Sequence, residues 1–151
     1  MPRIEEQVHI DAPPRDVFEY LASPENHLEI MPSLIAIENV ETLPDGGTAG
    51  DFVFKMLGVT LDGHFRDVTY NPPSRREYEM TGDVKGHMTY IIEDERGGAT
   101  VRLINDGETP GPAVLEKFTE PLATRYLRRE MASMGENLRM VVQETAAGVP
   151  P

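Results

Sequence analysis

The chain has 151 residues, the size of one ordinary domain, and 39% of them are hydrophobic, which is enough for a buried core. Acidic residues outnumber basic residues by 26 to 14, and the net charge of −12 makes nucleic acid and anionic membranes unfavourable partners. The sequence has no cysteine, no long apolar run and no apolar N-terminal stretch, so we expect a cytoplasmic protein without disulfides, secretory signal or stable membrane insertion.

The first part of the chain predicts one strand followed by two short helices. Arg3 to Ile10 places its apolar residues on one parity, as a half-buried strand does. Pro14 suits the first turn of a helix, and Ser23-Pro24-Glu25 repeats that start signal for a second helix. Pro32 ends the second helix.

Six further strands are predicted in the middle of the chain. The segments between them are short and rich in Gly, Pro, Asn and Asp, so neighbouring strands should form antiparallel hairpins. The predicted strands are Leu34–Leu43, Gly50–Leu57, Val59–Tyr70, Arg75–Thr81, Gly86–Glu93 and Ala99–Asp106.

A long helix is predicted from Pro112 to about Thr145. Its apolar residues recur at helical spacing: Leu115, Phe118, Leu122, Leu127, Met131, Met134, Leu138 and Val141 or Val142. Pro121 lies inside this helix and lacks a backbone donor, so we expect a bend there and a separate lid over Val114–Leu122. No linker divides the chain, so residues 1–145 should form a single domain with a frayed tail at 146–151.

This order of elements predicts an α+β fold. A run of antiparallel strands must bury one face, and the long C-terminal helix is the only element large enough to cover it. We expect a curved antiparallel sheet of about seven strands around that helix, with the two short helices after the first strand. Strong curvature would leave a space between the sheet and the helix.

Several segments also carry a family resemblance in their order along the chain. They are residues 12–22 (APPRDVFEYLA), 23–26 (SPEN), 30–32 (IMP), 56–59 (MLGV), 68–73 (VTYNPP), 97–101 (GGATV) and 121–131 (PLATRYLRREM). In these segments the chain resembles the START-like (SRPBCC) superfamily, with its helix-grip fold, and specifically the polyketide cyclase/dehydrase-like branch. The resemblance implies a hydrophobic cavity that takes lipids, polyketides, quinones or hormones, in a family where only a minority of members are enzymes.

The sequence offers little for metal or nucleophilic chemistry. The four histidines, His9, His27, His64 and His87, form no H-x-H or H-x-x-x-H pair, and there is no G-x-S-x-G motif or phosphate-binding loop. We therefore expect no metal and no cofactor. Acid–base chemistry stays open, with Arg66, Tyr90 and His87 as catalytic candidates and no catalytic residue assigned.

Strand parity sorts the residues that could face the cavity. If Leu57 and Gly58 form a two-residue turn, Met56 faces Val59 and Phe54 faces Leu61 on the apolar side. His64 and Arg66 then point to water. Val68 and Tyr70 share the parity of His64, however, so a bulge between Gly63 and Asp67 could turn Arg66 inward, and both arrangements remain open.

The predicted ligand site combines the inward side chains of the sheet with a roof from the long helix. Its members are Phe52, Phe54, Phe65, Tyr78, Met80, Met88, Tyr90, Leu103 and Asn105 from the sheet, and Val114, Phe118, Leu122 and Tyr126 from the helix. Asn105 either bonds to a loop or meets the ligand at the cavity mouth. The inward methionines either line an adaptable binding site or fill an ordinary core.

We therefore expect binding, transport or sensing of a small hydrophobic molecule in this cavity. Two alternatives stay open: a polyketide aromatase/cyclase or dehydratase, and a quinone- or lipid-binding accessory protein that serves a partner complex. A protein partner and a homo-oligomer are also left open. The acidic surface, with three lysines against eleven arginines, is typical either of a salt-rich cytoplasm or of high-GC codon usage.

Overall fold

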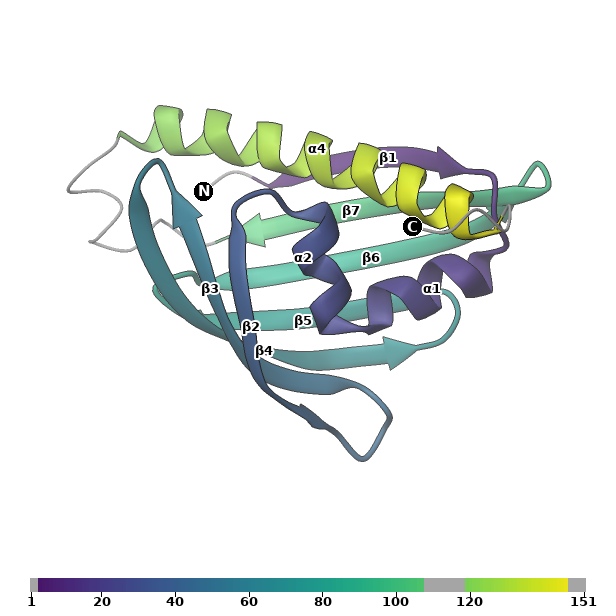
Figure 1. Cartoon of the computed structure of the whole chain (residues 1–151), viewed down its shortest axis with the longest axis horizontal. Coiled ribbons are helices and arrows are strands. Elements are labelled where there is room, and N and C mark those ends of the chain that lie inside the picture. The colour runs from purple at the N-terminus through teal and green to yellow at the C-terminus, as the bar shows by residue number, and fades with distance from the viewer. Residues whose placement is uncertain (1–2, 108–118, 147–151) are drawn as a thin grey trace.

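The structure is a computed structural model that describes residues 3–107 and 119–146. Figure 1 shows a curved sheet whose concave side is covered by one long helix and by two short helices. The helices are α1 (Pro14–Ala22), α2 (His27–Ile30) and α4 (Glu120–Ala146), and a short 3₁₀ turn, η1 (Pro24–Asn26), precedes α2. The predicted α+β helix-grip fold is confirmed.

The sheet has seven antiparallel strands in the order β1-β7-β6-β5-β4-β3-β2. Every neighbouring pair except β1 and β7 is a hairpin, as the short turns predict. The strands are β1 (Ile4–Ile10), β2 (Leu34–Thr42), β3 (Thr48–Met56), β4 (Val59–Asn71), β5 (Arg75–Gly82), β6 (Gly86–Glu95) and β7 (Gly98–Gly107).

The β3–β4 hairpin sets the register of the apolar wall. Leu57 and Gly58 both have positive φ, 49° and 86°, as a two-residue hairpin turn requires. Met56 consequently pairs with Val59, and Phe54 with Leu61, as parity predicts. Glycine is also required at Gly63, because a Cβ there would overlap the ring of Phe52.

A bulge in β4 decides which side chains reach the interior. The β4–β5 register shifts between Asp67 and Thr69, which leaves Val68 as the extra residue, 51% exposed. The inward parity of Phe65 therefore continues to Asp67, and Arg66 stays on the outer face. The bulge lies at Val68, just beyond the range from Gly63 to Asp67 in which a bulge would have turned Arg66 inward.

The long helix α4 begins later than predicted. Thr119 is not helical, and its carbonyl accepts a hydrogen bond from the backbone N–H of Ala123 at 3.1 Å. A helix running without interruption from Pro112 is therefore wrong. Pro121 lies in the first turn of α4, where a missing N–H costs no helical hydrogen bond, so no interior kink follows from it.

The inward face of α4 is set by helical spacing from Ala123. Ala123, Met131, Met134, Leu138 and Val142 are buried in the core. Leu122 is out of phase with this stripe and is 42% exposed. The helix packs against β1 and α2 and so closes the concave side of the sheet.

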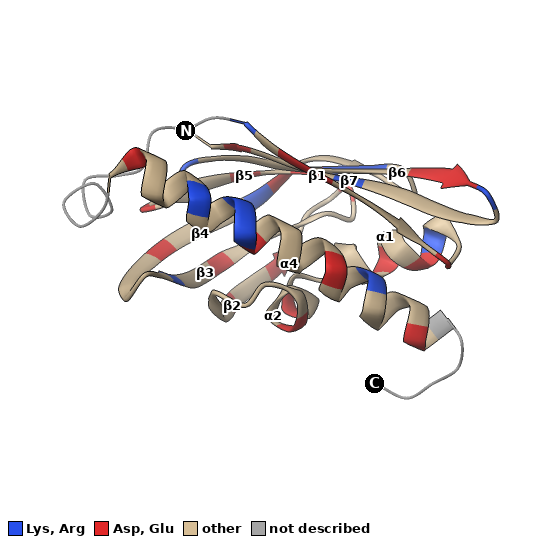
Figure 2. Cartoon of the chain, turned by 90° about the horizontal axis from the view of Figure 1, so that it is seen from above, with Lys and Arg blue, Asp and Glu red and all other residues tan. Residues whose placement is uncertain are grey.

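Most charged side chains lie on the outside of this arrangement, and Asp67, Arg76 and Glu130 are buried. Figure 2 shows acidic residues on the strands, on the short helices and along α4. Arg125, Arg128 and Arg129 lie on the first half of α4, and none of the three is buried. None of the helices within residues 3–107 and 119–146 is long and apolar enough to cross a membrane.

Candidate ligand-binding site

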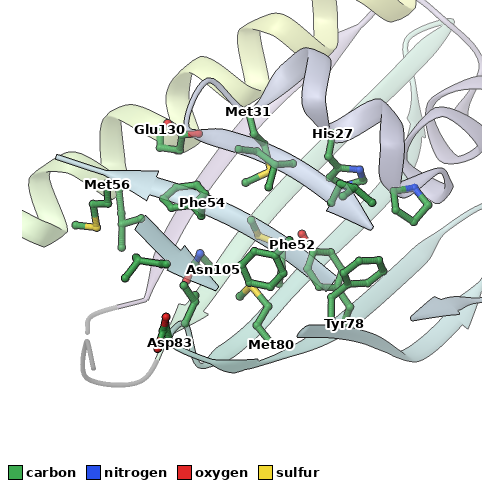
Figure 3. A pocket seen from close by; sticks show the side chains of 18 of the residues that line it. His27, Met31, Phe52, Phe54, Met56, Tyr78, Met80, Asp83, Asn105 and Glu130 are labelled. Atoms are coloured by element: carbon green, nitrogen blue, oxygen red, sulfur yellow. The ribbon is translucent and has the colours of Figure 1, made fainter. Parts of the chain in front are cut away.

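A cavity of about 110 Å³ lies between the concave face of the sheet, α2 and α4. Figure 3 shows aromatic and methionine side chains converging on it from several strands and from α2 and the residue that follows it. The predicted ligand-site residues that border it are Phe52, Phe54, Phe65, Tyr78, Met80, Met88 and Asn105. Further apolar lining comes from Met31, Leu34, Ile37, Met56, Leu61, Val84, Leu127 and Met131.

Other predicted ligand-site residues lie away from the cavity lining. Tyr90 and Leu103 are fully buried behind it, whereas Leu122 is exposed. Tyr126 is half-buried and donates a hydrogen bond to the backbone carbonyl of Lys55 at 3.3 Å. Val114 and Phe118 lie outside the described residues.

The three catalytic candidates do not border the cavity. Arg66 is exposed on the outer face of β4. His87 is half-exposed on β6, with its Nε2 3.5 Å from Oε2 of Glu79. Tyr90 is buried and bonded to protein neighbours. The positions of these residues give them no direct access to a molecule in the cavity.

A buried ion pair beside the cavity was not predicted from the sequence, and one of its partners, Arg76, borders the cavity. Nε of Arg76 donates to Oδ1 of Asp67 at 2.7 Å, and Nη1 donates to the carbonyl of Leu21 at 2.7 Å. Oδ2 of Asp67 accepts from the backbone N–H of Thr48 at 2.7 Å. Strand parity could have found both partners, because Arg76 shares the inward parity of Tyr78.

A chain of hydrogen bonds connects α2 to the sheet through three buried rings. Nε2 of His27 lies 2.8 Å from the hydroxyl of Tyr90, which lies 2.9 Å from the hydroxyl of Tyr78. The guanidinium of Arg76 stacks over the Tyr78 ring, with Cζ 4.7 Å from its centroid. Of the three rings, His27 and Tyr78 border the cavity, and Tyr90 lies behind them.

Burial keeps all three rings uncharged near neutral pH. It lowers the pKa of His27 from 6.5 to about 3, and the positive charge of Arg76 acts in the same direction. Burial also raises the pKa of the Tyr78 and Tyr90 phenols. The histidine is therefore neutral and both phenols keep their protons.

A second polar group holds α4 against the segment that follows α2. The carboxylate of Glu130 accepts from the backbone N–H of Ser33 at 3.0 Å and from its hydroxyl at 2.8 Å. The hydroxyl of Tyr126 also lies in contact with the Ser33 hydroxyl. Glu130 borders the cavity, so this contact ties α4 to the segment between α2 and β2 beside the cavity.

The exposed side chains of Asp83 and Lys85 also border the cavity, and few other polar groups remain for a ligand. The side-chain amide of Asn105 borders the cavity and makes no hydrogen bond to a described residue, which favours its position at the mouth over a bond to a described loop. Within the described part of the chain, no group of three His, Asp or Glu side chains is arranged to hold a metal ion. The arrangement suits an apolar molecule with few polar contacts.

The fold and this cavity define the class of the protein. The chain matches, over residues 1–143, the family described as "Polyketide cyclase / dehydrase and lipid transport". The chain therefore belongs to this family, and the predicted family is confirmed. The family description and the fold fit a polyketide cyclase-like protein that binds a hydrophobic ligand. Among curated proteins, no sequence matches the chain.

Solved structures share the whole fold at low sequence identity. The Zhui aromatase/cyclase from Streptomyces sp. R1128 is 17% identical, with a TM-score of 0.80 and 99% of each chain covered. A START superfamily protein from Mycobacterium smegmatis is 11% identical, with a TM-score of 0.78 and coverage of 95% of this chain and 98% of that one. The protein TTHA0849 from Thermus thermophilus is 19% identical, with a TM-score of 0.73 and coverage of 96% of this chain and 99% of that one.

Proposed function

We propose that the protein binds a small apolar molecule in the cavity between the sheet and α4, and that it serves to transport, store or sense that molecule. The observation that carries the proposal is the lining itself. Most lining residues are apolar, and they include aromatic rings such as Phe52 and Phe54 and thioethers such as Met80 and Met88. Such a surface gains free energy by excluding water.

Apolar burial supplies the main driving force for binding, before the entropy cost of association. A ligand that loses about 200 Å² of apolar surface to this cavity gains roughly 5 kcal/mol at ~25 cal/mol per Å². Methionine side chains adapt their shape at low cost, so the five that border the cavity allow several related ligands. They are Met31, Met56, Met80, Met88 and Met131.

The bonding of the polar groups favours binding over catalysis. A cyclase or dehydratase needs a base and an oxyanion donor that reach the substrate. In this cavity, Nε2 of His27 is bonded to Tyr90, and two guanidinium nitrogens of Arg76 are bonded to Asp67 and to the Leu21 carbonyl. The two buried groups His27 and Arg76 are thus already engaged with the protein.

A fluorescence titration with the neutral dye N-phenyl-1-naphthylamine tests the proposal. Met80→Trp places a larger side chain on the cavity wall, whereas Val68→Trp makes the matched change at an exposed position. We expect saturable dye binding to the parent protein and to Val68→Trp, and a loss of at least about tenfold in affinity for Met80→Trp. No saturable binding, or equal affinity in both variants, would contradict the proposal.

A further inference from the structure

We propose that the end of the cavity bordered by His27, Arg76 and Tyr78 selects apolar ligands that carry a hydrogen-bond donor, such as a phenol or an alcohol, over carbonyl compounds of the same shape. The selecting atom is the hydroxyl oxygen of Tyr78. The inference rests on the proposed function, since it concerns which apolar molecules the cavity prefers. It follows from the direction of the hydrogen bonds that join His27, Tyr90 and Tyr78.

The direction of these hydrogen bonds is fixed by the backbone carbonyl of Ser23, the residue before η1. Nδ1 of His27 lies 3.1 Å from the carbonyl oxygen of Ser23. A carbonyl oxygen can only accept, so Nδ1 must carry the proton. His27 is neutral, and a neutral imidazole has one N–H, so Nε2 has a lone pair and no proton.

The missing proton on Nε2 of His27 also determines which group donates in each of the two tyrosine hydrogen bonds. Because Nε2 of His27 can only accept, the hydroxyl of Tyr90 must donate to it across 2.8 Å. The single proton of Tyr90 is then used, so in the 2.9 Å bond between the two phenols Tyr78 is the donor. The proton of Tyr78 therefore points into the protein, toward Tyr90.

What remains on the Tyr78 oxygen is acceptor capacity. Among the residues that the structure describes, no other donor is bonded to this oxygen. Figure 3 shows the Tyr78 side chain at the cavity wall, on the same side as Phe52 and Met80. A ligand that places an O–H or N–H group here gains a hydrogen bond, whereas a ligand that places a carbonyl here meets an oxygen with no proton to donate.

Other donors in the lining are the amide of Asn105 and the ammonium of Lys85, and the competing donor beside Tyr78 is Arg76. Its guanidinium is a donor, and a carbonyl ligand would need to reach it. Arg76 is only 1% exposed, whereas Tyr78 is 7% exposed, and Nε and Nη1 of Arg76 are bonded to Asp67 and Leu21. The surface that meets a ligand therefore belongs more to Tyr78 than to Arg76.

Three probes of one shape test the inference by isothermal titration: 2-naphthol, which donates, 2-naphthaldehyde, which only accepts, and naphthalene, which does neither. For the parent protein we expect 2-naphthol to bind about 3- to 10-fold more tightly than either of the others. The Tyr78→Phe variant should lose the preference for 2-naphthol and should still bind naphthalene. Tyr70→Phe is the matched control, because Tyr70 packs against Phe18 away from the cavity lining, and it should keep the preference.

A second variant reverses the polarity. Tyr90→Phe removes the acceptor of the Tyr78 proton, so the Tyr78 hydroxyl becomes free to donate to a ligand, and 2-naphthaldehyde should gain affinity relative to naphthalene. Equal binding of 2-naphthol and naphthalene to the parent protein, or tighter binding of the aldehyde, would overturn the inference and leave the proposed function standing. No saturable binding of any probe would overturn both.

Discussion

Asp67 and Arg76 form an ion pair inside the molecule, with side chains that are only 1% and 2% exposed. Asp67 continues the inward alternation of Phe65 on β4, and Arg76 shares the inward face of the neighbouring strand β5 with Tyr78, so the two side chains meet in the interior. The pair neutralises a charge beside the cavity and ties β4, β5 and the end of α1 together through the Leu21 carbonyl.

Arg76→Met should lower the free energy of unfolding by about 3–5 kcal/mol, because it leaves the Asp67 carboxylate buried without its cation. Urea denaturation measures the change. Arg75→Met is the matched control, since Arg75 makes only a surface contact with Glu77 at 3.5 Å, and it should change stability by less than about 1 kcal/mol. Equal losses in the two variants would show that the buried pair has no special role.

Much of the fold follows from local sequence patterns. The alternation in Gly50–Leu57 and Val59–Tyr70, with a turn at Leu57-Gly58, predicts the observed β3–β4 register and therefore the inward positions of Phe52 and Phe54. Parity also contains the signal for the buried ion pair, since Asp67 and Arg76 lie on inward positions. A charged residue at such a position indicates a buried partner.

Other features depend on contacts that no local pattern contains. His27 lies far from Tyr90 in sequence, so their hydrogen bond exists only because α2 packs over the sheet. The choice of Ala123 over Leu122 for the inward face of α4 depends on how the helix is rotated about its axis, which its packing against β1 and α2 sets. The position of the β4 bulge is likewise set by pairing with β5.

The stability of the protein should fall as the pH drops below about 6.5. The unfolded chain protonates His27 near 6.5, whereas burial lowers the folded pKa to about 3, so the unfolded state binds the extra proton throughout this window. The contribution reaches about 1.4 kcal/mol per pH unit. Urea denaturation between about pH 7 and pH 5 should show this slope in the parent protein and a smaller slope in His27→Gln, and identical slopes would contradict the assignment.

Phe54→Ala should weaken binding of N-phenyl-1-naphthylamine by about 1–3 kcal/mol, because it removes apolar wall area and enlarges the cavity. Arg66→Ala and His87→Phe alter side chains outside the cavity lining and should leave dye affinity within a few-fold. A dye titration of the three variants gives the comparison. Loss of binding in Arg66→Ala with retention in Phe54→Ala would place the site elsewhere.

The melting temperature should rise between low salt and molar KCl. Acidic side chains are in excess by twelve charges, and salt at 1 M screens their repulsion beyond ~3 Å. Scanning calorimetry in KCl measures this response. A melting temperature that does not change with KCl would indicate that the arginine-rich, acidic composition reflects codon usage instead of adaptation to salt.

Methyl NMR of the protein with ¹³C-labelled methionine methyl groups tests ligand binding in this cavity most directly. Met31, Met56, Met80, Met88 and Met131 border the cavity, whereas Met140 is 48% exposed on α4. On addition of naphthalene we expect the signals of the five lining methionines to shift together and to saturate, while the Met140 signal stays in place. Saturable shifts confined to Met140, or no shift of the five lining signals, would contradict the account.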